Sequence, residues 1–178
     1  MKNSICCLLL ITVSGLLTQS SCKKNIPPET VTINGLTFGC RVDGKAFIAD
    51  YWDYGNNIPP LELDFIANSN NSLRLLLIAK RQNEKIVIYL NNPLVQGMHE
   101  LKYNTRPFPT YDPPKDNGAY IVSFPYTEYI TNETIGGYVD LISMDTVTLK
   151  VYAKFEFTGT DKLTNKQIKI TNGIFKNY

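Results

Sequence analysis

The residue types best suited to ligand recognition are concentrated in the segment 50–54, which reads Asp-Tyr-Trp-Asp-Tyr. The carboxylates of Asp50 and Asp53 would accept hydrogen bonds from sugar hydroxyls, while the ring of Trp52 stacks on the apolar face of the sugar. The opposing interpretation is a loop that enters the core through this lone tryptophan, because aromatic side chains supply much of a core's buried area. We take Asp50, Trp52 and Asp53 as candidate ligand-binding residues, and both interpretations stay open.

A second candidate site is the segment 104–118, the longest stretch without hydrophobic periodicity. It contains four prolines, with Phe108 and Tyr111 between them. Proline lowers the conformational entropy that is lost on ordering, so the two rings would serve as semi-rigid anchors for a ligand. The segment could equally fold over the end of a sheet with both rings buried. Phe108 and Tyr111 are therefore candidate ligand-binding residues whose exposure decides between these hypotheses.

Catalytic and metal-binding patterns do not stand out in this sequence. His99 is the only histidine, so it alone has an unperturbed pKa suited to general base catalysis near neutral pH. It has no serine or cysteine nucleophile motif beside it, and a structural role is the favoured interpretation. Neither 50–54 nor 112–118 has the ligand spacing of a calcium loop. We expect no enzyme activity, metal or cofactor, and a hydrolase using Asp50 or Asp53 ranks last among the hypotheses.

Hydrophobic alternation with period two defines the elements that would hold these residues. Phe38 and Cys40 lie on one face of a predicted strand, and Asp43-Gly44 is a strong hairpin signal that places Cys40 opposite Phe47. Similar runs recur along the chain, and apolar residues nowhere keep helical spacing for three turns. The pattern predicts an all-β domain, namely an antiparallel β-sandwich or flattened barrel of roughly eight to ten strands.

The clearest strand is predicted at 148–158, after a tight turn at Asp145-Thr146. Its apolar side chains alternate with polar ones and should face the core: Leu149, Val151, Ala153, Phe155 and Phe157. A further strand is predicted at 167–175. There Asn172-Gly173 is expected to form a β-bulge that returns Phe175 to the core side.

The N-terminus has the parts of a secretory signal: a positive charge, an apolar run over 5–17 and a small polar stretch before Cys22. As a helix that run would span about 20 Å, which is too short for a hydrocarbon core of about 30 Å. The stretch resembles a bacterial lipobox, which implies that residues 1–21 are a signal peptide and that Cys22 carries a lipid. A polar tether at 22–35 and one domain at 36–178 are predicted to follow.

Cleavage of the signal has consequences for charge and for the cysteines. It would remove Lys2 and leave 17 of the 18 basic side chains against 16 acidic ones, which excludes the strong positive charge of a nucleic acid-binding domain. Cys6 and Cys7 would leave with the signal, and Cys22 would be modified. Cys40 would then have no partner, so in an oxidising envelope it is expected to be buried.

Residues 37–47 (TFGCRVDGKAF) resemble the opening of a Bacteroidota envelope lipoprotein family of unknown function. Residues 155–157 (FEF) and 170–175 (ITNGIF) are similar to motifs near the end of that family. The resemblance implies an envelope lipoprotein and brings no established active site. The segment 145–147 also resembles the Asp-Ser/Thr-aliphatic pattern at which Bacteroidota attach O-glycans, so Thr146 is a candidate O-glycosylation site.

These features together predict a membrane-anchored binding or adaptor module that recognises a glycan or an envelope protein. The alternative is a closed β-barrel that carries a small apolar ligand. Lys23, Lys24 and Asn25 follow Cys22, whereas surface-displayed Bacteroidota lipoproteins resemble one another in carrying an acidic run there. We therefore expect a location at the outer membrane, facing the periplasm, with the lipid anchor as membrane contact and no nucleic acid partner.

Overall fold

The computed structural model describes residues 28–50, 59–67, 73–91, 95–102, 117–123 and 127–178. The described residues contain no helix and form one 12-stranded sheet. Its strands are β1 (Val31–Ile33), β2 (Leu36–Val42), β3 (Lys45–Phe47), β4 (Leu61–Ala67), β5 (Leu73–Arg81), β6 (Glu84–Leu90), β7 (Gly97–Leu101), β8 (Gly118–Ser123), β9 (Thr127–Ile130), β10 (Gly137–Asp145), β11 (Lys150–Asp161) and β12 (Gln167–Lys176).

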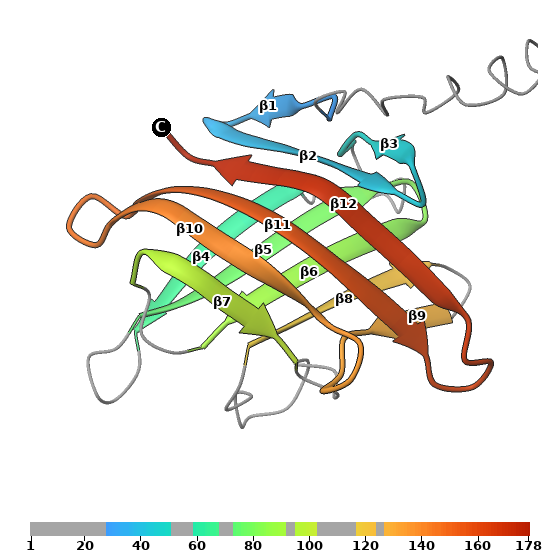
Figure 1. Ribbon diagram of the computed structural model, residues 1–178. Coiled ribbons are helices and arrows are strands. Elements are labelled where there is room, and N and C mark those ends of the chain that lie inside the picture. Colours follow the sequence, from blue (N-terminus) through green and yellow to red (C-terminus); the bar gives the residue numbers. More distant parts are fainter. Residues whose placement is uncertain (1–27, 51–58, 68–72, 92–94, 103–116, 124–126) are drawn as a thin grey trace, which may run out of the picture.

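The sheet bends into a flattened, nearly closed antiparallel barrel of 9 strands, which confirms the all-β prediction. Its path runs β1-β2-β12-β11-β9-β8-β6-β5-β4, and β10 and β7 extend it from β11. In Figure 1, β2, β12, β11, β10 and β7 form a front layer, with β1 at its edge, and β4, β5, β6, β8 and β9 form a back layer. The two layers enclose one hydrophobic core.

The long strand β11 connects the layers. Its first part pairs with β10, whereas Thr160 and Asp161 pair with Ile130 and Tyr129 of β9. A single strand therefore leaves the front layer and enters the back layer. The sheet closes on itself at this side without a separate connection between layers.

The Asp43-Gly44 hairpin forms as predicted. Both residues have positive φ, 48° and 80°, which is the backbone geometry of a two-residue hairpin loop. The register places Cys40 opposite Phe47, also as predicted. A similar turn at Asn34-Gly35, with φ of 52° and 79°, joins β1 to β2, so the end of the segment predicted as a tether is a short edge strand.

The bulge predicted at Asn172-Gly173 is also present. The pairing of β11 with β12 shifts register between Phe155 and Phe157, and Asn172 has a φ of 53°. The backbone N–H of Asn172 donates to a carboxylate oxygen of Glu156 at 3.1 Å. The extra residue restores the inward direction of Phe175, which is fully buried.

One strand boundary differs from the prediction. Residues 146–149 form a turn, and Leu149 lies outside β11 with a φ of 54° and an exposure of 37%. The carboxylate of Asp145 accepts hydrogen bonds from the backbone N–H groups of Val147 and Thr148, at 2.9 and 3.1 Å. These bonds stabilise a longer turn than expected, because an aspartate side chain competes with the strand for nearby backbone donors.

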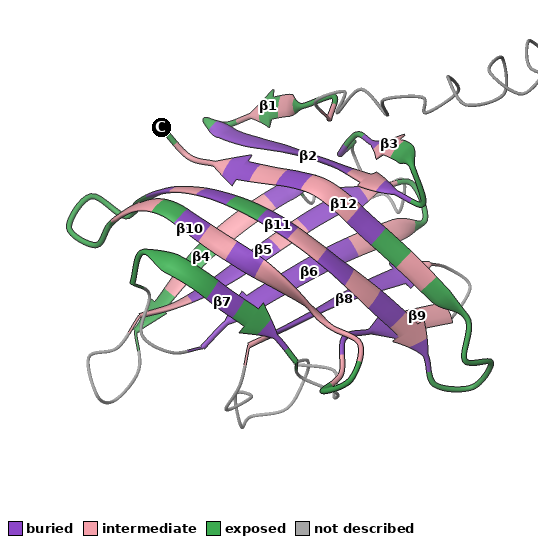
Figure 2. Cartoon of the chain, viewed as in Figure 1, coloured by how far each residue is buried: buried purple, intermediate pink, exposed green. Residues whose placement is uncertain are grey.

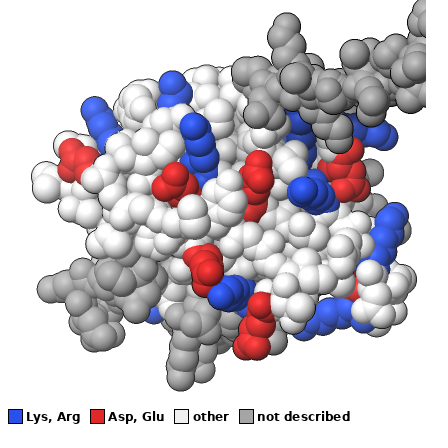
Figure 3. All heavy atoms as spheres, in the orientation of Figure 1, with Lys and Arg blue, Asp and Glu red and all other residues white. Residues whose placement is uncertain are grey.

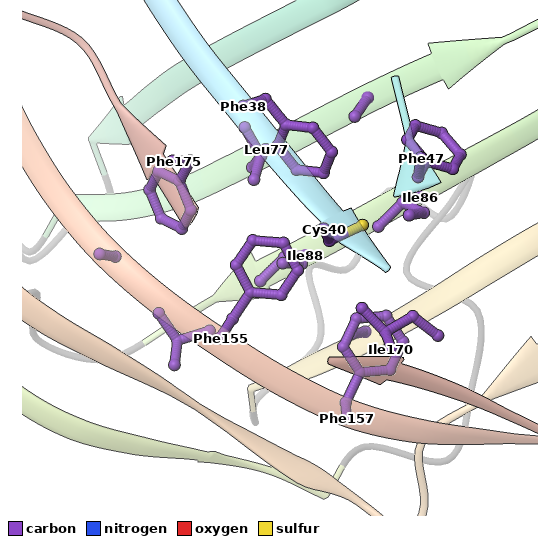
Figure 4. Close-up of a cluster of buried hydrophobic side chains, with 14 of the residues drawn as sticks. Phe38, Cys40, Phe47, Leu77, Ile86, Ile88, Phe155, Phe157, Ile170 and Phe175 are labelled. Atoms are coloured by element: carbon purple, nitrogen blue, oxygen red, sulfur yellow. The ribbon is translucent and has the colours of Figure 1, made fainter. Parts of the chain in front are cut away.

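Phenylalanine rings fill the middle of the barrel, between the two layers (Figure 4). The ring centroid of Phe155 lies 5.7 Å from that of Phe38 and 6.1 Å from that of Phe175. The ring of Phe157 is stacked on Phe155 at 6.4 Å. A Cβ atom at Gly173 would overlap the Phe155 ring, so this glycine provides the space that the ring occupies. Figure 2 shows the resulting alternation of buried and more exposed residues along β11 and β12.

Cys40 lies in this core with none of its surface exposed. Burial raises the pKa of its thiol far above the ordinary value, so the reactive thiolate is not populated at neutral pH. We predict that a maleimide reagent leaves Cys40 unmodified in the folded protein and modifies it fully in denaturant. Mass spectrometry of both samples measures this. Equal labelling rates in the two states would mean that β2 presents its other face to the core.

Candidate functional site

The described part of the chain contains only some of the residues predicted to bind ligand. Asp50 is described and lies next to a cleft. Trp52, Asp53, Phe108 and Tyr111 lie outside the described residues, as does the predicted lipid attachment residue, Cys22.

The Asp50 cleft lies at one end of the barrel and encloses about 480 Å³, within the usual range of ligand sites. The segment after β3, the β5–β6 turn and the end of β8 position its lining: Ile48, Asp50, Arg81, Gln82, Asn83, Glu84 and Ser123. The backbone N–H of Asp50 donates to the carbonyl of Lys80 at 2.9 Å. This bond attaches the segment after β3 to β5.

Arg81 is held rigidly in the wall of this cleft. Its Nε and Nη2 atoms lie 2.7 and 2.6 Å from the same carboxylate oxygen of Glu84. Its Nη1 donates to the carbonyl of Ala46 at 2.7 Å, and its guanidinium lies 4.5 Å from the centroid of the Phe47 ring. Three nitrogen atoms of the planar Arg81 guanidinium are engaged in these contacts, so its position is fixed. Arg81 therefore supports the wall of the cleft and holds the Glu84 carboxylate in place.

Carboxylate, amide and hydroxyl groups converge in this cleft. Gln82 and Asn83 supply amides and Ser123 a hydroxyl, so donors and acceptors are available together. Such a set recognises a ligand rich in hydroxyl or amide groups. The described lining residues include no histidine or cysteine, and among them nothing resembles a paired nucleophile and base.

A second cleft, of about 770 Å³, lies at the other end of β8. It is lined by Met98, His99, Glu100, Lys102, Asn117 and Glu133. Asn117 belongs to the segment 104–118, and its Oδ1 accepts from the backbone N–H of Asn91 at 2.8 Å. The described end of that predicted binding segment is thus fixed at a surface cleft.

His99 supports the back of the second cleft. Its side chain is largely buried, and its Nε2 lies 2.8 Å from the carbonyl oxygen of Val95. A ring nitrogen in this contact donates its hydrogen to the carbonyl, which fixes the ring and leaves Nδ1 as the acceptor in the neutral form. The geometry favours the structural role that the sequence suggested for His99.

A third groove, of about 470 Å³, lies on the outer face of the front layer beside β1. Its lining residues come from both ends of the described chain: Thr30, Thr32, Thr37, Tyr152, Ile174, Lys176 and Tyr178. Sequence reasoning missed this groove. The only available signal was that Tyr152 and Lys176 occupy outward positions on strands with an apolar inner face.

Comparisons with protein-family models, curated proteins and solved structures find no match for this chain. The resemblance to Bacteroidota lipoproteins therefore rests on the sequence motifs and stays a prediction. Within the described ranges, no helix is long and apolar enough to cross a bilayer. The same residues contain no group of three or more histidine, cysteine or acidic side chains arranged around a metal position.

The charged groups are spread over the surface. On the face shown in Figure 3, acidic and basic side chains are interspersed and form no patch of one sign. This face therefore offers no electrostatic footprint for a polyanion such as nucleic acid.

The candidate O-glycosylation residue, Thr146, is exposed in the turn between β10 and β11. Hydrogen bonds from Thr148 and Val147 to Asp145 hold the turn and lower the pKa of that carboxyl group. The neighbouring Val147 is 89% exposed, so a modifying enzyme would have access to this loop. Glycosylation of Thr146 stays a prediction, which the mass of the protein from its native host tests.

Proposed function

We propose that this protein is a membrane-anchored, non-catalytic binding or adaptor module of the bacterial envelope that recognises a glycan or an envelope protein. The observation that carries the proposal is the Asp50 cleft. It gathers acidic, amide and hydroxyl groups from three separate segments at one end of a rigid barrel. A site of this kind, whose lining is supported by paired strands, suits recognition by hydrogen bonds.

The packing of the barrel supports recognition at the surface over the alternative of an enclosed apolar ligand. Phe38, Phe155 and Phe175 occupy the space between the layers, and Phe155 fits directly against Gly173. The Asp50 cleft and the cleft beside His99 are open at the surface and contain mostly polar groups. The alternative would be favoured if the purified protein took up one equivalent of a fluorescent fatty acid tightly.

The proposal predicts that the Asp50 carboxylate contributes to binding. On an array of bacterial envelope glycans, we expect Asp50→Ala to weaken binding about tenfold, since a hydrogen bond to a charged group contributes about 1.5–3 kcal/mol. Asp64→Ala is the matched control, because Asp64 is an exposed aspartate on β4 outside the cleft. It should change affinity less than twofold. Thermal denaturation confirms that both variants are folded.

A protein ligand is tested in cells with a photoreactive amino acid at position 82 in the same cleft. The proposal expects a discrete adduct with one envelope protein that disappears with Asp50→Ala and persists with Asp64→Ala. The absence of both glycan binding and a specific adduct would overturn the proposed function.

A further inference from the structure

The groove beside β1 has a wall that is fixed by close packing. Residues 28–30 lie against β2 at Gly39, where a Cβ atom would overlap the carbonyl oxygen of Glu29 and lie 2.9 Å from Cγ2 of Thr30. Only a glycine allows this approach. Thr30 is therefore held in the groove wall, and β1 continues the wall by pairing with β2. A preformed wall lowers the cost of ordering on binding.

Neutral hydroxyl groups line one side of the groove. The hydroxyl oxygens of Thr32 and Thr37 lie 2.8 Å apart, so one donates its hydrogen to the other. The accepting hydroxyl keeps its own hydrogen for a further bond, and both oxygens keep lone pairs. Thr30 adds a third hydroxyl. Hydroxyl groups of threonine both donate and accept hydrogen bonds, and so do the hydroxyl groups of a sugar. The two sets are therefore complementary.

Apolar and aromatic surface lines the other side. Tyr152 lies directly across from Lys176 in the pairing of β11 with β12, and Ile174 is next to it in the lining. Tyr178 is 63% exposed, and Nζ of Lys176 lies 5.5 Å from the centroid of its ring. An exposed ring whose position is supported by a neighbouring cation offers a flat surface for stacking.

We propose that this groove is a carbohydrate-binding subsite, in which a sugar ring stacks on Tyr178 or Tyr152 and its hydroxyls bond to the threonines. The inference rests on the proposed function and specifies its ligand class. Rings and hydroxyls occur together in this lining, whereas the described lining residues of the other two clefts include no aromatic side chain. Sugars present both an apolar face and a polar edge, so they need both kinds of surface.

The position of the groove fits a ligand near the membrane. Thr30 follows the predicted lipid-bearing Cys22 by eight residues, which span at most about 28 Å when extended. A lipidated chain would thus hold the groove close to the bilayer. Glycans attached to or lying along that membrane would be within its reach.

The test is calorimetric titration of the detergent-solubilised full-length protein with four hexasaccharides: cellohexaose, maltohexaose, mannohexaose and chitohexaose. We expect at least one to bind with a Kd of about 1 mM or tighter. Tyr178→Ala should weaken that binding about fivefold or more through loss of stacking. Thr32→Val keeps the side-chain shape and should weaken it about threefold through loss of the hydroxyl.

Two variants control for indirect effects. Tyr178→Phe keeps the ring and should bind within twofold of the wild type. Tyr138→Ala removes another tyrosine of the front layer, on β10 outside the groove, and should also bind normally. Hexasaccharide binding that groove variants leave unchanged but Asp50→Ala abolishes would overturn the subsite and keep the proposed function. No binding to any of the four sugars would overturn the carbohydrate assignment, and the cross-linking experiment at position 82 would then decide the proposed function separately.

Discussion

Replacing Phe155 by alanine should lower the free energy of unfolding by about 4 kcal/mol, which is the usual cost of truncating a buried aromatic side chain. Phe155 is fully buried and contacts the rings of Phe38, Phe157 and Phe175. For a domain of this size, the midpoint of thermal unfolding should fall by about 10 °C or more. Circular dichroism during heating measures the change.

A control substitution at Lys154 and a second substitution at Gly173, which contacts Phe155, test this interpretation. Lys154→Ala removes the neighbouring exposed side chain of β11 and should change stability by less than about 0.5 kcal/mol. Gly173→Ala places a methyl group where the Phe155 ring lies, and overpacking of this kind costs about 1–3 kcal/mol. Combining Gly173→Ala with Phe155→Leu should cost less than the sum of the two single changes. Additive losses would show that the two residues do not share one space.

Replacing Cys22 by serine should move the protein from the membrane fraction to the soluble envelope fraction almost completely. A serine cannot receive the thioether-linked lipid, and two or more acyl chains, at about 0.8 kcal/mol per buried CH₂, would supply the anchoring free energy. Detergent phase partitioning followed by immunoblotting measures the distribution. Retention of the variant in the detergent phase would contradict the lipoprotein prediction.

A second cysteine substitution separates lipidation from export. Cys7→Ser changes a cysteine inside the predicted signal, so the mature protein should be unchanged and stay in the membrane fraction. If both substitutions released the protein, the effect would have to come from altered export. In the wild type, protease added to intact cells should leave the protein uncut, because we predict that it faces the periplasm.

Local patterns in the sequence are enough to predict the clearest strands, such as β2 and most of β11, and their inner faces. Side chains alternate across a strand with a period of two, so the burial of Cys40 and Phe155 follows from their neighbours alone. The turn at Asp43-Gly44 and the bulge at Asn172-Gly173 are equally local, because each depends on residues that tolerate positive φ. The prediction failed at Leu149, where hydrogen bonds from the turn to Asp145 outweighed the apolar alternation.

The clefts could not be predicted in this way, because their walls come from distant parts of the chain. Asp50 and Ser123 meet at one cleft, and Thr30 and Tyr178 at another. To predict that these residues meet, one must know which strands are neighbours in the sheet. No local pattern contains that information, since many strand orders would bury the same apolar faces.

The sequence by itself determined that this protein is all-β, that side chains such as Phe38, Cys40 and Phe155 lie in its core and, as predictions, its export signal and lipid anchor. These properties depend on residues that are close together in the chain. Only the tertiary structure decided that β11 joins two layers into one barrel and that β2 pairs with both β1 and the C-terminal strand β12, so that residues of all three line one groove. Strand order is selected by the packing of the whole core, in which Phe155 fits against Gly173 and residues 28–30 fit against Gly39.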